Sequence, residues 1–182
     1  MSTRTARPSV LLARTSAAFA LLVLTGLAVT ACGGGSGGGD PESLMAAAND
    51  AMGSGDYSTA SQKLDAAIEA LGADGPADMR YRARVNRARC TIRNGEGDTG
   101  KKDFLALVGE FGDRVDWKDY KRIGESLSDE DFNDEAMDVI LAGIERFPDQ
   151  KKALDEVMLA IASKPDLGGD AAERLKTLGY VD

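Results

Sequence analysis

The sequence predicts an all-α fold in which about eight helices form successive antiparallel pairs. Three observations support this prediction. Apolar residues recur at helical spacing in several consecutive runs, breaks rich in glycine and aspartate separate these runs, and β-branched runs are scarce after residue 40. Aromatic residues make up only 5% of the chain, while alanine and glycine are abundant, which favours helices that touch through small side chains over sheets.

The predicted helices begin directly after Pro41, a residue that suits the first position of a helix. Glycine-rich breaks at 53–56, 72–76 and 95–100 separate the first four helices, and Pro148 ends the sixth. The eight predicted helices cover residues 42–52, 57–71, 78–94, 101–111, 117–127, 131–147, 151–163 and 170–178.

The predicted helix 78–94 carries apolar residues on two separate strips of its surface. The broader strip contains Tyr81, Val85, Ala88 and Ile92, and the narrower one contains Met79, Ala83 and Cys90. A helix with two apolar strips must bury both of them, so we expect it to be wedged between neighbours on opposite sides. Cys90 is then expected to be a buried free thiol rather than half of a disulfide with Cys32.

The hairpin 117–148 shows the most regular pattern of small and apolar residues. Its small residues and final proline are Gly124, Ala136, Gly143 and Pro148, with Tyr120, Ile123, Leu127 and Ile140 between them. This pattern resembles a tetratricopeptide repeat, which implies an α-solenoid of helical hairpins with a groove for peptides. Matching units start near residues 41, 81 and 117, at spacings of 40 and 36 rather than the ~34 residues of that family. The array is therefore irregular. The unit starting at 81 matches the family pattern poorly, because Gly100 stands where an alanine is expected. A non-repeat helical bundle is the alternative.

Residues 1–31 have the composition of a bacterial signal peptide. The first 14 residues contain three arginines and no acid, and residues 17–31 are apolar. An apolar run of 15 residues is shorter than the ~20 that a membrane-spanning helix needs. Removal of residues 1–31 leaves 151 residues, which suit one domain with a core of its own, and changes the formal net charge from −8 to −11.

The apolar run ends in Val29-Thr30-Ala31-Cys32. This motif resembles the lipobox of bacterial lipoproteins, which implies lipidation of Cys32 and cleavage between Ala31 and Cys32. An ordinary signal peptide followed by an unrelated cysteine is the alternative. Because several acyl chains together anchor a protein firmly, the resemblance implies a membrane-anchored chain.

A glycine-rich tract follows Cys32, so residues 32–41 are expected to be a flexible tether and residues 42–182 the helical domain. Gly33 stands where an aspartate would mark retention at the inner membrane in lipoprotein sorting. The expected location is therefore the periplasmic side of the outer membrane or the cell surface.

The composition excludes several functions. A net acidic chain is repelled by phosphate backbones, which argues against nucleic-acid binding. The chain has no histidine, so His-based catalytic triads and His metal ligands are excluded, and we expect no enzyme activity, no cofactor and no metal. The acidic run 128–135 lacks the central glycine of a calcium loop, and 95–101 lacks the strand and the Ser/Thr of a phosphate-binding loop.

Six arginines lie within residues 78–94, in two stripes on roughly opposite sides of the helix. We expect the stripe of Arg82, Arg89 and Arg93 to line the groove, because planar guanidinium groups bind carboxylates well, as they do in the groove of the resembled family. The alternative is that these arginines form ion pairs with the acids at Asp113, Asp116, Asp119 or 129–138. The sequence thus predicts a membrane-anchored scaffold or interaction module for a protein or peptide partner. If the stripe of Arg82, Arg89 and Arg93 binds this partner, the partner is expected to be acidic. An accessory subunit of an envelope enzyme or a structural spacer are the alternatives.

Overall fold

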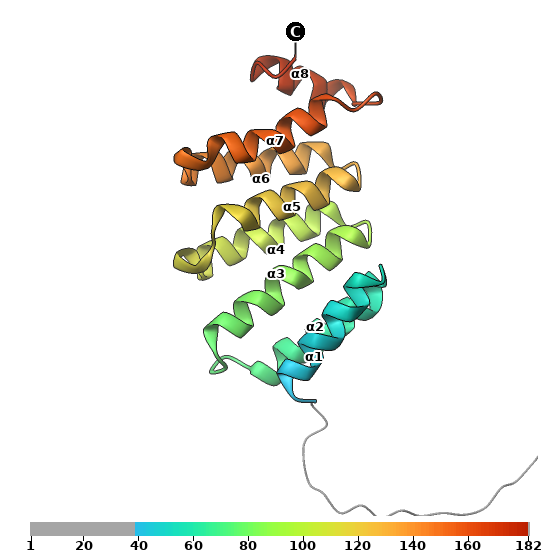
Figure 1. Ribbon diagram of the computed structural model, residues 1–182, viewed down its shortest axis with the longest axis vertical. Coiled ribbons are helices and arrows are strands. Elements are labelled where there is room, and N and C mark those ends of the chain that lie inside the picture. Colours follow the sequence, from blue (N-terminus) through green and yellow to red (C-terminus); the bar gives the residue numbers. More distant parts are fainter. Residues whose placement is uncertain (1–38, 182) are drawn as a thin grey trace, which may run out of the picture. The chain divides into compact units, whose positions relative to one another are not determined.

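The computed structural model describes residues 39–181, so Cys32, the signal peptide and most of the glycine tract lie outside the described residues. The described part is all-α and contains eight α-helices packed in sequential antiparallel pairs (Figure 1). The helices are α1 (Pro41–Gly53), α2 (Tyr57–Leu71), α3 (Ala77–Arg93), α4 (Gly97–Glu110), α5 (Trp117–Asp129), α6 (Asn133–Arg146), α7 (Lys151–Ala162) and α8 (Gly169–Thr177). The prediction of an all-α fold of paired helices is confirmed.

The odd-numbered helices of neighbouring pairs also contact one another. Helix α5 packs against α3 on one side and against α7 on the other, while α4 packs against α6. The first hairpin is joined differently, because α2 rather than α1 makes the main contact with α3. Short 3₁₀ turns, Gly112–Arg114 and Pro148–Gln150, lead from α4 into α5 and from α6 into α7.

The turns that close the first three pairs share one geometry. Each contains a residue with positive φ, namely Gly55 (80°), Gly95 (88°) and Asp131 (63°). In each turn the next residue donates its N–H to the carbonyl five residues back, at 2.9 Å, 3.1 Å and 2.9 Å. These bonds satisfy carbonyls at the helix end in the manner of a Schellman motif. The turns recur at spacings of 40 and 36 residues, the same spacings as the units in the sequence.

The difference between the two spacings lies in α3. Helices α1 and α5 each have 13 residues, whereas α3 has 17, which is one additional helical turn. Ala48 and Gly124 are the eighth residues of α1 and α5, and Ala88 is the twelfth of α3; all three are buried. The longer spacing therefore reflects an added turn at the start of α3.

Helix α4 begins at Gly97, four residues before the predicted start at 101. Gly97 lies against the Phe132 ring, where a Cβ atom would overlap the ring, and Gly100 lies against Ile92, where a Cβ would overlap that side chain. A Cβ on Gly100 would also come within 2.9 Å of the Ala88 carbonyl oxygen. These two glycines are therefore sites of close packing inside a helix rather than helix breakers.

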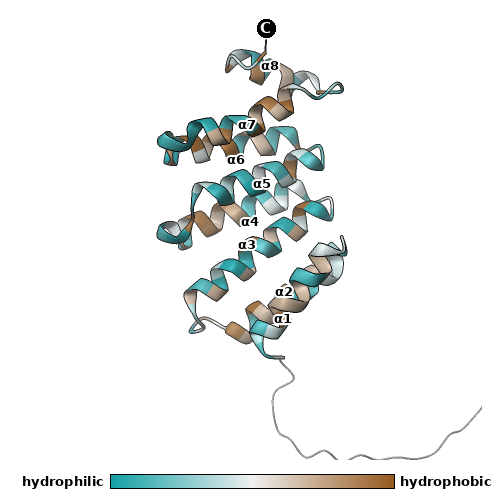
Figure 2. Ribbon diagram, in the orientation of Figure 1, coloured by the Kyte–Doolittle hydropathy of each residue, from teal (hydrophilic) through white to brown (hydrophobic). Residues whose placement is uncertain are grey.

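The buried residues form two clusters, and α3 contributes to both. Its Tyr81, Val85, Ala88 and Ile92 join the larger cluster, which extends through α4 to α8, whereas Ala83 and Cys90 join a smaller cluster with α1 and α2. Figure 2 shows hydrophilic residues over much of α3, with hydrophobic positions between them. The prediction that this helix is wedged between neighbours through two apolar strips is confirmed, as is the buried free thiol of Cys90.

Candidate interaction face

The six arginines of α3 have different partners in the structure. Arg84 and Arg87 belong to the stripe that was not assigned to the groove, and both form ion pairs on the side of α2 and α4. Arg84 pairs with Glu110, while Arg87 lies 3.1 Å from Asp65 and 3.4 Å from Asp103. These pairs tie α3 to its neighbours and line a cleft of about 190 Å³ between α2, α3 and α4. We interpret this stripe as structural.

Arg93, a predicted groove residue, forms ion pairs inside the domain. Its guanidinium lies 2.5 Å from Asp129 and 3.1 Å from Glu130, at the C-terminal end of α5. Burial opposes the charge of Arg93, but the hydrogen bonds to these two acids outweigh burial and raise its pKa. For Arg93 the structure therefore agrees with the alternative, internal pairing, and we do not include it in the candidate face.

Arg82 and Arg89 form no ion pair with any residue in the range 39–181. Arg82 is exposed, whereas Arg89 is partly buried and its Nε has no hydrogen-bond partner in this part of the chain. Burial lowers the pKa of Arg89, and the positive charges of Arg122 and Arg93 lower it further. The immediate surroundings of Arg89 are thus electropositive, although the chain as a whole is acidic.

Arg122 and Lys118 on α5 complete this group, and neither was predicted from the sequence. They lie four residues apart and are exposed on the same side of α5. Arg122 has one long ion pair, 3.4 Å to Asp119, whose carboxylate also accepts a hydrogen bond from Tyr81. The sequence signal that could have identified them is their spacing of four residues, which places two cations on one side of the helix 117–129.

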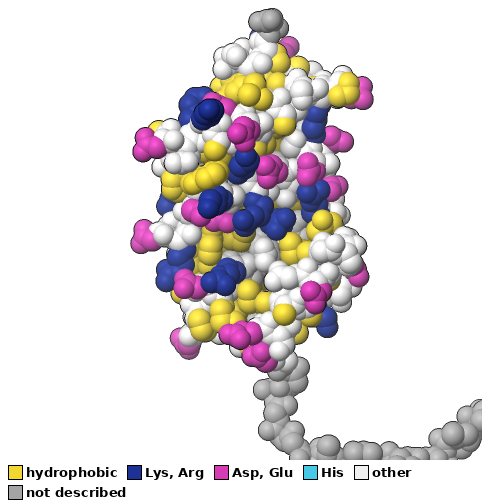
Figure 3. All heavy atoms as spheres, in the orientation of Figure 1, with side chains coloured by type: hydrophobic (Ala, Val, Ile, Leu, Met, Phe, Trp, Pro, Cys, Tyr) yellow, Lys and Arg dark blue, Asp and Glu magenta, His cyan; other side chains and the backbone are white. Residues whose placement is uncertain are grey.

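We call Arg82, Arg89, Lys118 and Arg122 the basic face. Figure 3 shows Lys and Arg side chains gathered over the region of α3 and α5. Toward α7 the surface is no longer purely basic, because Lys121 pairs with Glu156 and lies 3.9 Å from Glu125. A shallow cleft of about 130 Å³ lies there between α5 and α7.

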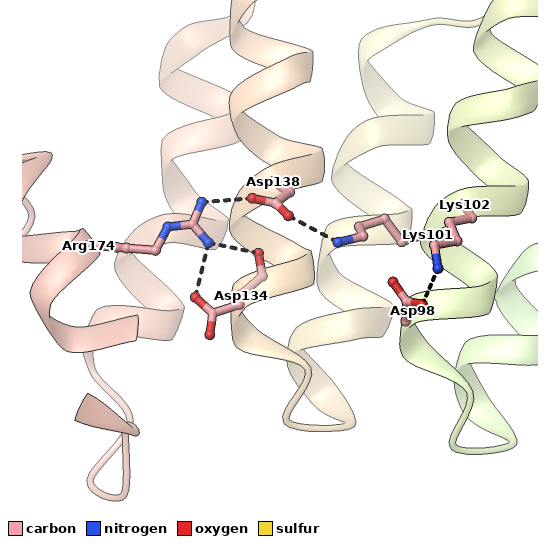
Figure 4. A network of polar contacts seen from close by, with 6 residues as sticks. All are labelled: Asp98, Lys101, Lys102, Asp134, Asp138 and Arg174. Carbon is pink, nitrogen blue, oxygen red and sulfur yellow. Dashed lines mark hydrogen bonds and ion pairs between the residues drawn. The ribbon is translucent and has the colours of Figure 1, made fainter. Parts of the chain in front are cut away.

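The even-numbered helices carry a separate polar network, drawn in Figure 4. Asp138 of α6 lies 3.0 Å from Lys101 of α4 and 2.7 Å from Arg174 of α8, and Arg174 also lies 3.0 Å from Asp134. Lys101 and Arg174 are thus both paired with acids. Burial opposes ionisation of Asp138, but the hydrogen bonds from Arg174 and Lys101 outweigh it and lower its pKa.

Between residues 39 and 181 no group of three or more His, Cys, Asp or Glu side chains is placed to hold a metal ion. Burial raises the pKa of the Cys90 thiol to about 11, so this thiol is protonated near neutral pH and is a poor nucleophile. The basic face groups two arginines that make no ion pair within residues 39–181, Arg82 and Arg89, and is therefore the candidate binding surface.

The fold and the face define a class: an all-α domain of stacked antiparallel helix pairs with an exposed basic surface on two of its odd-numbered helices. No model of a known protein family matches the chain, and a search of curated proteins finds no significant relative. Among the described helices, none combines the length and the apolar composition needed to cross a membrane.

Proposed function

We propose that this protein is a membrane-anchored lipoprotein whose helical domain is an interaction module for an acidic segment of a partner protein. The observation that carries the proposal is the placement of the basic face. Arg82 and Arg89 make no ion pair within the described part of the chain, although the chain has 30 acids and 22 basic residues. Clustered cations whose one ion pair is the long contact from Arg122 to Asp119 favour an anionic ligand, and guanidinium groups suit bidentate carboxylate binding.

We further propose that the domain is an irregular array related to tetratricopeptide repeats. The shared turn geometry at Gly55, Gly95 and Asp131 supports this proposal, as do the small buried residues at equivalent positions of α1, α3 and α5. In such an array the odd-numbered helices line the partner-binding side, which is the side of the basic face. The added turn of α3 is the main departure from the regular unit.

The interaction is tested by charge reversal on exposed positions of the face. Arg82→Glu, Lys118→Glu and Arg122→Glu are combined in one variant, and Lys63→Glu, Lys102→Glu and Lys176→Glu, on even-numbered helices, are combined in a control with the same net charge. We expect a fluorescent peptide rich in glutamate to bind the wild type and the control, and to bind the face variant at least tenfold more weakly. Equal binding by all three proteins would contradict the proposal, provided that circular dichroism shows all three to be folded.

The anchor is tested separately in a bacterial host that processes lipoproteins. We expect the wild-type chain to incorporate labelled fatty acid and to fractionate with membranes, because lipid on Cys32 would hold it there. Cys32→Ala should remove both the label and the membrane association. Membrane association of the Cys32→Ala chain, or an unlabelled wild type, would contradict lipidation; labelling at the outer membrane would support the location proposed from Gly33.

A further inference from the structure

The first hairpin has a charge very different from that of the rest of the domain. Residues 40–76 contain seven acids and a single base, Lys63. One of these acids is neutralised by α3, since Asp65 pairs with Arg87. The other six, which make no ion pair within residues 39–181, are Asp40, Glu42, Asp50, Asp56, Glu69 and Asp74.

These six carboxylates are all exposed, and Figure 3 shows acidic side chains at the α1–α2 end of the domain. The cations of the basic face begin only at Arg82, beyond this hairpin. The domain is therefore electrostatically polar, with a negative end at α1 and α2 and a positive patch on α3 and α5. Proteins with this pattern orient themselves near charged surfaces.

The chain places the negative end next to the proposed anchor. Only eight residues, 33–40, separate Cys32 from the start of α1, and this length spans at most about 28 Å when fully extended. A lipid on Cys32 would thus keep the hairpin within about 28 Å of the bilayer, and a surface potential that decays over ~8 Å at physiological ionic strength would act on it whenever the linking residues are well short of full extension. Cations near an anionic bilayer bind it, so a basic face that was free to turn toward the membrane would be covered by lipid headgroups.

We propose that the acidic α1–α2 hairpin is a membrane-repelling spacer, which keeps the domain off an anionic bilayer and leaves the basic face open to its partner. This inference rests on the proposed function, because it needs both the anchor and the face. The surface it concerns is lipid with negatively charged headgroups. Neutral lipid would exert no such repulsion.

The mature chain, residues 32–182, provides the probes for a direct test. Cys32 can be coupled to a maleimide lipid, while Cys90 is buried and does not compete. Trp117 is the only tryptophan in the chain and serves as donor to a dansyl-labelled lipid in the vesicle. Coupled protein is compared on vesicles of phosphatidylcholine and on vesicles of phosphatidylcholine mixed with phosphatidylglycerol.

The test variant combines Glu42→Lys, Asp50→Lys and Glu69→Lys. The control combines Glu145→Lys, Asp149→Lys and Glu173→Lys, which are also exposed and unpaired within the described chain and change the net charge equally. For the wild type and the control we expect about twofold less energy transfer on the anionic vesicles than on the neutral ones, a difference that raised salt removes. For the test variant, transfer should be greater on the anionic vesicles.

A second readout is binding of the glutamate-rich peptide to the coupled protein. On anionic vesicles the test variant should bind it about tenfold more weakly than the control, because lipid covers its basic face. Equal energy transfer from the wild type on both vesicles, or equal behaviour of the test and control variants, would overturn the spacer. If peptide binding is absent on both vesicles while energy transfer behaves as expected, the partner proposal fails and the repulsion stands.

Discussion

The Tyr81 hydroxyl on α3 donates a hydrogen bond to the Asp119 carboxylate on α5, and both side chains are buried. Asp119 also closes the capping box at the start of α5, where it accepts a hydrogen bond from the backbone N–H of Asp116 at 3.2 Å. Burial, followed by the negative carboxylate beside the hydroxyl, raises the Tyr81 pKa. The pair therefore joins the second and third hairpins beneath the basic face.

Tyr81→Phe should lower the free energy of unfolding by about 1–3 kcal/mol, because it leaves a buried carboxylate with one donor fewer. Urea denaturation followed by circular dichroism measures this loss. Tyr57→Phe is the matched control, since within the described residues the Tyr57 hydroxyl makes no hydrogen bond, and it should change stability by less than about 0.5 kcal/mol. Equal losses in the two variants would show that the Tyr81–Asp119 bond adds no stability.

Gly100→Ala should destabilise the domain by about 1–3 kcal/mol, because the new methyl group would overlap Ile92 and force α3 and α4 apart. Gly109→Ala, on the same helix, is the control. No atom lies within 4 Å of the Cβ position at Gly109, so this change should raise stability by up to about 1 kcal/mol. Thermal denaturation compares the two, and the close packing of Gly100 is refuted if both alanines have the same effect.

Asp138 should stabilise the domain in a pH-dependent way. Its pKa in the folded protein is lower than the usual 3.8, so its ionised form is favoured by folding. The contribution is complete above pH 3.8 and is lost as pH falls through the lowered pKa. The wild type should therefore be more stable than Asp138→Asn near neutral pH, and the difference should shrink below pH 3.8.

Urea denaturation of the wild type and of Asp138→Asn between neutral and acidic pH measures this difference. Asp149→Asn, an exposed position with no ion pair within residues 39–181, is the control and should show no such trend. A difference between the wild type and Asp138→Asn that stays constant with pH would rule out a role for the ionised carboxylate.

Cys90 should be unreactive in the folded protein. Burial raises its pKa to about 11 although Arg89 and Arg87 favour the thiolate, so little thiolate exists at pH 8 and access is blocked. In a Cys32→Ser background, Ellman's reagent should modify no thiol in native protein and one thiol per chain in denaturant. Rapid modification of the native protein would mean that the contact between α3 and the first hairpin opens readily.

The sequence alone was sufficient for the fold class and for the role of α3. Helical periodicity depends on local residue order, so the two strips of α3 predicted two buried clusters, which the structure contains. Helix boundaries were predicted well where a proline or a capping residue marks them. They were wrong at α4, where Gly97 and Gly100 were interpreted as breakers.

The tertiary structure decided what those glycines and the arginines do. Gly97 and Gly100 lie within a helix because Phe132 and Ile92 occupy the space where their side chains would be, and these contacts join separate parts of the chain. In the same way, the helical-wheel pattern of one helix grouped Arg93 with Arg82 and Arg89. Only the packing of α5 on α3 brings Asp129 and Glu130 close to Arg93. The same packing brings Arg122 toward Arg89. Ion pairs form between side chains that are distant in sequence, so the pattern within a single helix cannot determine which charges remain free.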